Sequence, residues 1–128
     1  MSGRILVVDD HDENRRILHD LLDGAGFELL EAATGEEAVQ LAEQHVPDLI
    51  LMDIQLPGID GHEATRRIKA NPALRRIPII AVTSYALAGD EAKALAAGCD
   101  DYVAKPFSPR ALLAKVRGFL DKPKVSSP

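Results

Sequence analysis

Five polar residues stand directly after apolar runs of the sequence, where buried strands are expected to end. They are three carboxylic acids, a hydroxyl and an amine: Asp9, Asp10, Asp53, Thr83 and Lys105. Each type alone has an ordinary explanation, because acids cap helices, threonines pack in cores and lysines are solvated. Gathered carboxylates are costly, however, since two of them roughly 4 Å apart repel each other by about 4 kcal/mol at an effective dielectric of about 20. The set as a whole therefore predicts a functional site.

A hard divalent cation is the natural compensation for gathered carboxylates. Mg²⁺ prefers oxygen ligands, binds through one or two carboxylates and keeps several of its waters. The histidines are scattered and form no His/Cys cluster for zinc: His11, His19, His45 and His62. His11 adjoins the acid pair, at the rim of the expected site. The residue types thus favour Mg²⁺ as the cofactor.

Strand-like runs alternate with helical patterns along the chain. Strands are expected at Ile5–Val8, Phe27–Ala32, Leu49–Met52, Ile79–Val82 and Tyr102–Ala104. Helices are expected over residues 12–25, from Thr34 to before Pro47, and over residues 61–70, 89–97 and 108–120. The first helix carries Ile17, Leu18, Leu21 and Leu22 as its apolar residues. This alternation predicts an α/β domain with a parallel sheet covered on both faces.

The apolar character of the runs predicts the order of the strands. The first, third and fourth runs are apolar throughout, as central strands require, whereas the second is mixed and the fifth is short. The order 2-1-3-4-5 of a doubly wound sheet accommodates this. In that order ligands bind beyond the carboxyl ends of strands 1 and 3. Asp9, Asp10 and Asp53 follow those two strands.

Length and composition limit the classes of function. The 128 residues suit one domain, expected over residues 1–121, with a polar and flexible tail over residues 122–128. The net charge of −5 argues against a nucleic-acid surface. No apolar run approaches the ~20 residues that span a bilayer, and the first residues are no signal peptide. We expect a cytoplasmic protein.

The polar residues and their neighbours also carry a family resemblance. The motifs are Val7-Val8-Asp9-Asp10, Leu51-Met52-Asp53, Leu56-Pro57-Gly58-Ile59-Asp60-Gly61, Val82-Thr83-Ser84 and Tyr102-Val103-Ala104-Lys105-Pro106. In this order they resemble the receiver domain of two-component response regulators, of the single-domain type. The resemblance covers residues 4–120 and implies a flavodoxin-like fold.

The resemblance implies a role for each acid. Asp53 is the phosphoacceptor, whose carboxylate takes a phosphoryl group from a phosphohistidine. Asp10 and Asp53 ligate Mg²⁺ directly, together with the backbone carbonyl of Gln55. Asp9 acts on the cation through a bound water. The chain then catalyses only its own phosphorylation and slow autodephosphorylation, and is a regulator rather than an enzyme.

The resemblance also implies the parts that move. Lys105 and Thr83 contact the phosphoryl oxygens, and Thr83 and Tyr102 change position as the switch. Gln55 and Tyr85 tune the loss of the phosphate. Two charge-assisted bonds of about 1.5–3 kcal/mol each could supply most of the free energy needed to switch the conformation. Inverting a two-state equilibrium takes about 5.5 kcal/mol, so the margin is small. The peptide bond between Lys105 and Pro106 is expected to be cis.

Partners follow from the same resemblance. A sensor histidine kinase or a histidine phosphotransfer protein docks near Asn14, Arg15 and Leu18 and near the Pro106–Phe107 loop. A downstream protein binds the face formed by the last two helices and the last strand. Neither nucleic acid nor a membrane is an expected partner.

Other interpretations of the same residues remain as alternatives. A dehalogenase-type phosphohydrolase shares the carboxylates, but it needs an Asp-x-Asp pattern after the first strand. A flavin or nucleotide carrier needs a Gly/Ser/Thr-rich loop there, and Asp9-Asp10-His11 repels phosphate instead. A receiver that only binds its partner is a third alternative. A receiver cut from a hybrid histidine kinase or a larger regulator is a fourth.

Overall fold

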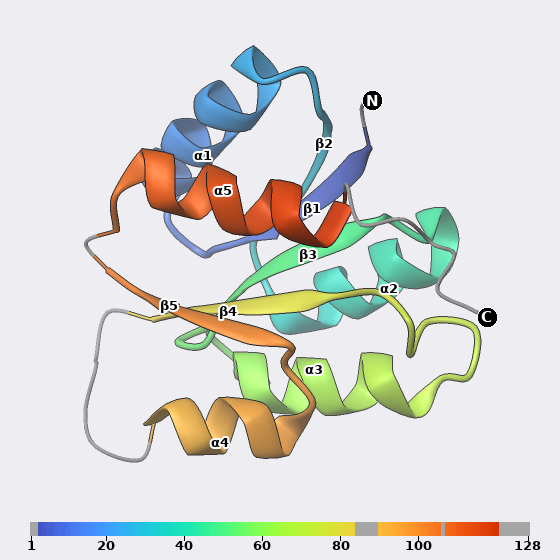
Figure 1. Cartoon of the computed structure of the whole chain (residues 1–128). Helices are drawn as coiled ribbons and strands as arrows, with labels where there is room; N and C mark the ends of the chain where they lie inside the picture. The colour runs from blue at the N-terminus through green and yellow to red at the C-terminus, as the bar shows by residue number, and fades with distance from the viewer. Residues whose placement is uncertain (1–2, 84–89, 106, 121–128) are drawn as a thin grey trace, which may run out of the picture.

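A computed structural model describes residues 3–83, 90–105 and 107–120, and of Asp90 and Glu91 only the backbone. The strands are β1 Arg4–Val8, β2 Glu28–Ala32, β3 Leu49–Asp53, β4 Ile79–Thr83 and β5 Asp101–Ala104. The helices are α1 Asp12–Gly24, α2 Gly35–His45, α3 Gly61–Ala70, α4 Asp90–Ala97 and α5 Pro109–Leu120. Strands and helices alternate along the whole described chain (Figure 1).

The five strands form one parallel sheet in the order β2-β1-β3-β4-β5, which confirms the predicted fold class and strand order. Every residue of β3 and β4 is buried, as central strands of a doubly covered sheet must be. The edge strand β2 exposes Glu28 and Glu31, the two charges that interrupt its apolar pattern. Charged residues of this kind protect an edge against further strand pairing.

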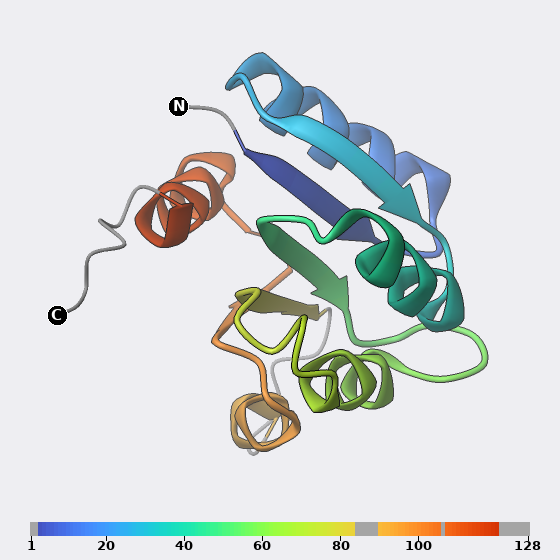
Figure 2. The same cartoon turned by 90° about the vertical axis from the view of Figure 1, so that its right-hand side faces the viewer.

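The alternation of side chains along each strand divides the core into two layers. Ile5 and Val7 of β1 face α1 and α5, whereas Leu6 and Val8 face α2, α3 and α4. Figures 1 and 2 show the sheet between these two layers of helices. Because all five strands are parallel, their carboxyl ends reach the same edge of the sheet. The helices cover the two faces of the sheet and not this edge.

The first helix differs from its predicted pattern at one residue. Leu18 and Leu22 are buried and Leu21 is partly buried, but Ile17 is 54% exposed. A helix turns by about 100° per residue, so Ile17 lies about 140° from Leu22, beyond the edge of the buried stripe. Ile17 therefore belongs to the apolar residues of α1 but not to its buried ones.

The N-terminal caps of α2 and α1 are formed in different ways. Thr34 caps α2 by accepting the backbone N–H of Glu37 at 3.1 Å. The Glu37 carboxylate accepts the N–H of Ala33, one residue before the position that a capping box requires. Asp12 does not cap α1, because it is the first helical residue and His11 holds the cap position. The helix α1 thus begins one residue earlier than a cap at Asp12 would place it.

Some expected features concern parts of the chain outside the described residues. These are Tyr85, Pro106 with the expected cis bond, and the tail over residues 122–128. Within the described ranges, no helix has both the length and the apolar character needed to cross a bilayer. Cys99 is buried, and desolvation raises the pKa of its thiol, which is consistent with a packing role.

Candidate functional site

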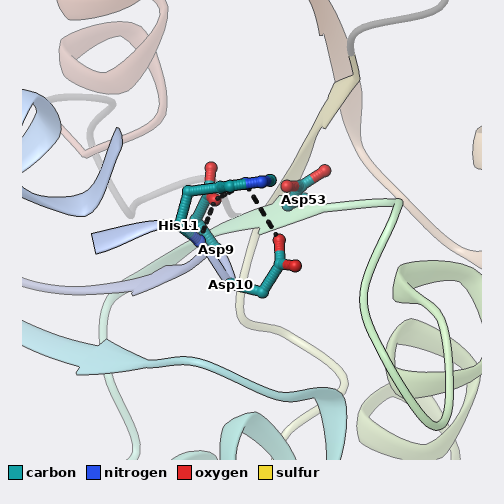
Figure 3. A group of neighbouring side chains, drawn as sticks. All are labelled: Asp9, Asp10, His11 and Asp53. Carbon is teal, nitrogen blue, oxygen red and sulfur yellow. Dashed lines mark hydrogen bonds and ion pairs between the residues drawn. The ribbon is translucent and has the colours of Figure 1, made fainter. Parts of the chain in front are cut away.

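The three predicted acids come together beyond the ends of β1 and β3. Figure 3 shows Asp9, Asp10 and Asp53 with their side chains converging, and His11 lies over them. One ligand atom from each of these four residues lies within 4.8 Å of all the others. Asp9 and Asp53 are 1% and 4% exposed. The sequence-based prediction that these acids form one cluster is confirmed.

The predicted amine joins this cluster. The Nζ atom of Lys105 lies 3.0 Å from Oδ2 of Asp9 and 3.6 Å from Oδ2 of Asp53. The backbone N–H of Lys105 donates to the carbonyl of Thr83 at 2.6 Å, so the ends of β4 and β5 are tied together. Thr83 is buried at the end of β4, one residue beyond the position that pairs with Asp53. All five predicted residues therefore lie at one edge of the sheet.

Asp53 carries an unfavourable charge in this position. Burial is the largest influence and raises the pKa of its carboxyl above the ordinary value of 3.8. The backbone N–H of Gln55, which donates to Oδ1 at 3.1 Å, and the Lys105 ammonium act in the opposite direction. The carboxylates of Asp9 and Asp10 raise the pKa further. A cation beside Asp53 would relieve both the repulsion and part of the burial cost.

The turn after β3 fixes the position of Asp53. The N–H of Gly61, the first residue of α3, donates to the carbonyl of Ile54 at 2.9 Å. A Cβ atom on Gly61 would lie 2.3 Å from the carbonyl oxygen of Asp53 and 2.7 Å from Cα of Ile54. The glycine is needed here because the start of α3 touches the backbone of the phosphoacceptor candidate.

His11 has a closer relation to the acids than its sequence position indicated. Its Nδ1 atom lies 3.3 Å from Oδ1 of Asp9 and 3.2 Å from Oδ1 of Asp10. Its backbone N–H also donates to Oδ1 of Asp9, at 2.9 Å. Its place in the sequence predicts only a position at the rim of the site. Adjacency to the acid pair was the only signal, and adjacency does not show where a ring points.

Arg15 is a second residue whose place the sequence did not reveal. Its Nη1 donates to the backbone carbonyl of Asp9 at 2.6 Å, and its Nε lies 3.3 Å from Glu31. Its guanidinium also pairs with Asp12, and its side chain is only 16% exposed. The group thus joins the end of β1 to α1 and β2. As a result it braces the backbone that carries Asp9.

The expected docking surface needs a correction at Leu18. This side chain is 4% exposed and belongs to the core between the sheet and α1 with α5. It cannot contact a partner without leaving the core. The exposed apolar side chain of α1 is Ile17. The docking prediction at Leu18 came from the family resemblance, and the burial of this side chain shows that it is wrong.

The remaining predicted residues are placed by the structure, but their roles are not tested by it. Tyr102 lies on β5 and packs, partly buried, against the core layer of α2, α3 and α4. Gln55 is exposed two residues after Asp53. Gln55 thus follows the carboxyl end of β3, where the acids gather, whereas Tyr102 pairs with Ala81 in the middle of β4.

The chemistry of the cluster fits a magnesium ion. Three carboxylates and one ammonium leave a formal charge of −2 with His11 neutral, which one divalent cation balances. The oxygen atoms are hard donors, and the two more exposed members, Asp10 and His11, leave room for bound water. The residues that would hold the ion come from the end of β3 and from the segment between β1 and α1.

Comparison with known proteins places this fold and site in a family. The model of the response regulator receiver domain matches residues 5–117. The polar-differentiation response regulator DivK of Brucella ovis is 40% identical over 120 residues, which cover 94% of this chain and 98% of that protein. The chain therefore belongs to the response regulator receiver domain family of two-component signalling.

Solved structures agree with this assignment. The receiver domain of the sensor histidine kinase PA1611 from Pseudomonas aeruginosa, which has a magnesium ion in its active site cleft, is 39% identical with a TM-score of 0.88. The match covers 95% of this chain and 100% of that one. A receiver domain of a histidine kinase from Syntrophus aciditrophicus is 32% identical with a TM-score of 0.89, over 98% and 95% of the two chains. The family is regulatory, which favours a signalling role over the phosphohydrolase and carrier alternatives.

Proposed function

We propose that this protein is a phosphorylation switch in which Asp53 accepts a phosphoryl group from a phosphohistidine, with Mg²⁺ bound beside it. The observation that carries the proposal is a buried carboxylate with a raised pKa, 3.6 Å from an ammonium and clustered with two further acids. Perturbed titratable groups at the ligand-binding edge of a doubly wound sheet are candidates for chemistry.

The proposed step forms one bond and breaks one. A carboxylate oxygen of Asp53 attacks phosphorus, and the phosphorus–nitrogen bond of the phosphohistidine breaks, leaving the electron pair on the imidazole. The N–H of Gln55 holds Oδ1 at 3.1 Å, so Oδ2, which faces Lys105, is the freer oxygen. Mg²⁺, when bound, neutralises charge on the phosphoryl group. Asp10, Asp53 and the carbonyl of Gln55 are its proposed ligands.

The remaining predicted residues have proposed roles around this step. Asp9 holds a water on the cation, and its Oδ2 keeps Lys105 next to Asp53. Lys105 and Thr83 bind the phosphoryl oxygens after transfer, at about 1.5–3 kcal/mol for each charge-assisted bond. The sum reaches the ~5.5 kcal/mol that inverts a two-state equilibrium only at its upper end, so the switch is finely balanced.

The conformational response is proposed to pass through Thr83 and Tyr102. Thr83 moves toward the phosphoryl group, and Tyr102 on the edge strand β5 follows it inward. Gln55 and Tyr85 tune the lifetime of the phosphate. The output surface is the face of α4, β5 and α5, where Leu95 is an exposed apolar side chain.

The proposed donor is a sensor histidine kinase or a histidine phosphotransfer protein. It docks on α1 near Asn14 and the exposed Ile17, close to the site. A second candidate is a receiver that operates within a longer histidine kinase. That candidate is supported by the likeness to two receiver domains that are parts of histidine kinases.

Intact mass after treatment with acetyl phosphate and Mg²⁺ tests the proposal. One phosphoryl group should be gained by the wild type, and none by Asp53→Asn or by the wild type in EDTA. Asp20→Asn, which changes an exposed acid on α1, is the matched control and should be phosphorylated normally. Phosphorylation of Asp53→Asn at the wild-type level would move the acceptor to another residue, and no phosphorylation at all would support a receiver that only binds.

A further inference from the structure

The imidazole of His11 lies beside the acids, where it could serve as an additional metal ligand. We propose that Nδ1 of His11 binds the divalent cation directly and shifts the preference of the site toward ions that accept nitrogen, such as Zn²⁺ and Ni²⁺. The inference rests on the cation site of the proposed function. It adds a determinant of metal selectivity that belongs to this chain.

The distances around Nδ1 match those between neighbouring ligands of one ion. Ligands about 2.1 Å from a metal in an octahedral arrangement lie about 3.0 Å from their neighbours. Nδ1 of His11 lies 3.3 Å from Oδ1 of Asp9 and 3.2 Å from Oδ1 of Asp10. Nδ1 of His11 and Oδ1 of Asp10 are therefore spaced to bind a single ion as neighbouring ligands, while Asp9 lies close enough to hold a water on that ion.

Hydrogen bonding accounts for only part of this arrangement. Nδ1 carries at most one hydrogen, so a neutral or charged ring donates well to one of the two carboxylates and not to both. Lys105 compensates Oδ2 of Asp9 and Oδ2 of Asp53. Among the described residues, His11 is the only ion-pair partner of Asp10. The side of the cluster that faces His11 is thus the side that lacks a fixed cation.

Within the part of the chain that the structure describes, the ring of His11 makes ion-pair contacts only with the two acids of the site, Asp9 and Asp10. The residue is the N-cap of α1, but its side chain makes no cap hydrogen bond. The side chain is 68% exposed, so it packs against little and can rotate toward an ion. Figure 3 shows the ring lying over Asp9 and Asp10, on the side of Asp53.

The consequence is a change in selectivity. An all-oxygen site suits Mg²⁺, whereas imidazole favours Zn²⁺, Ni²⁺ and related ions. Mg²⁺ gains little from nitrogen and can replace it with one of the waters that it normally keeps. His11 should therefore raise the affinity for Zn²⁺ and Ni²⁺ while leaving the affinity for Mg²⁺ almost unchanged.

Calorimetric titration of the full chain with Mg²⁺, Zn²⁺ and Ni²⁺ tests the proposal. His11→Ala should weaken Zn²⁺ and Ni²⁺ binding about tenfold or more, because even outer-sphere partners of a metal contribute that much. Its Mg²⁺ affinity should stay within about twofold. The matched control is His19→Ala, since His19 also pairs with a carboxylate, at 3.1 Å from Glu31, but lies outside the cluster. That variant should bind all three ions as the wild type does.

A second readout does not depend on a variant. In wild-type protein with nitrogen-15 histidine, Zn²⁺ should shift the Nδ1 resonance of His11 far more than Mg²⁺ does. The proposal is overturned if His11→Ala loses affinity equally for all three ions, or if its Zn²⁺ affinity is unchanged. It is also overturned if Zn²⁺ does not shift the Nδ1 resonance of His11 in the wild type. If Mg²⁺ itself fails to bind wild type, the cation site of the proposed function fails as well, whereas normal Mg²⁺ binding confines the failure to His11.

Discussion

The Nζ atom of Lys105 lies 3.0 Å from Oδ2 of Asp9, although 96 positions separate the two residues in the sequence. The pair joins the segment after β5 to the end of β1 across the carboxyl edge of the sheet. It places an ammonium group next to the atoms that would hold a metal. Lys105 therefore competes with a cation for the same carboxylates.

Removing that charge should strengthen magnesium binding. Two unit charges about 4 Å apart interact by about 1 kcal/mol in water and about 4 kcal/mol at a protein surface, and tenfold in affinity is 1.4 kcal/mol. Lys105→Met should therefore raise Mg²⁺ affinity by about tenfold in calorimetric titration, while it impairs the response to phosphorylation. Lys93→Met, which alters an exposed lysine of α4, should change neither property. Weaker Mg²⁺ binding in Lys105→Met would show that the ammonium organises the acids more than it opposes the ion.

Asp53 should make the stability of the metal-free protein depend on pH. Burial raises the pKa of this carboxyl, so the folded protein binds the proton more tightly than the unfolded chain does. The stability that Asp53 contributes is therefore fully present below the ordinary value of 3.8 and is lost as the pH rises through the folded-state pKa. At neutral pH the buried charge is a net cost.

Neutralising Asp53 should remove that cost. Asp53→Asn keeps an oxygen for the Gln55 N–H and should stabilise the protein by about 1 kcal/mol at neutral pH in urea unfolding with EDTA. The gain should shrink toward zero near pH 3.8, and saturating Mg²⁺ should reverse it, since the ion stabilises only the wild type. Asp20→Asn on the exposed face of α1 should show neither trend. A gain that did not depend on pH would assign the effect to packing.

The fold was predictable because its patterns are local and strong. Apolar runs and their charge interruptions defined β1, β3 and β4 as central strands and β2 as an edge, and the strand order followed. Strand order in turn brought Asp9, Asp10 and Asp53 together, since parallel strands end at one edge. These predictions needed no knowledge of side-chain orientation.

Orientation is what the sequence could not supply. His11 and Arg15 act through a ring and a guanidinium that turn toward the end of β1, and neither direction follows from spacing. Helical spacing grouped Ile17 with Leu18, yet only Leu18 is buried, because the rotation of α1 on the sheet depends on all its contacts at once. Such features arise from packing between distant segments, so no local window contains them.

The close approach at Gly61 should make the turn after β3 intolerant of any side chain. Gly61→Ala places a methyl group 2.3 Å from the carbonyl oxygen of Asp53, which forces the backbone of β3 or α3 to shift. Such overpacking against backbone should destabilise the protein by about 3 kcal/mol. Acceptor activity should fall as well, because Asp53 moves with the backbone.

A glycine of α5 provides the matched control for that change. Nothing lies within 4 Å of a Cβ built on Gly118, which is inside the helix. Gly118→Ala should therefore stabilise the protein by about 0.5–1 kcal/mol, since alanine is the better helix former. Urea unfolding of both variants gives the comparison. A stable, readily phosphorylated Gly61→Ala would show that the contact with Asp53 is not needed.

The guanidinium of Arg15 should support the acids rather than contact a partner. It donates to the carbonyl of Asp9 at 2.6 Å and reaches Glu31 on β2, a combination that a lysine cannot reproduce. Arg15→Lys keeps the charge but should lower stability by about 1 kcal/mol and weaken Mg²⁺ binding severalfold, because the backbone that carries Asp9 loses its brace. Arg16→Lys, on the exposed side of the same helix, should alter neither quantity. If Arg15→Lys instead slows phosphoryl transfer from a histidine kinase with stability and Mg²⁺ affinity unchanged, the guanidinium acts in docking, and the bracing role is wrong.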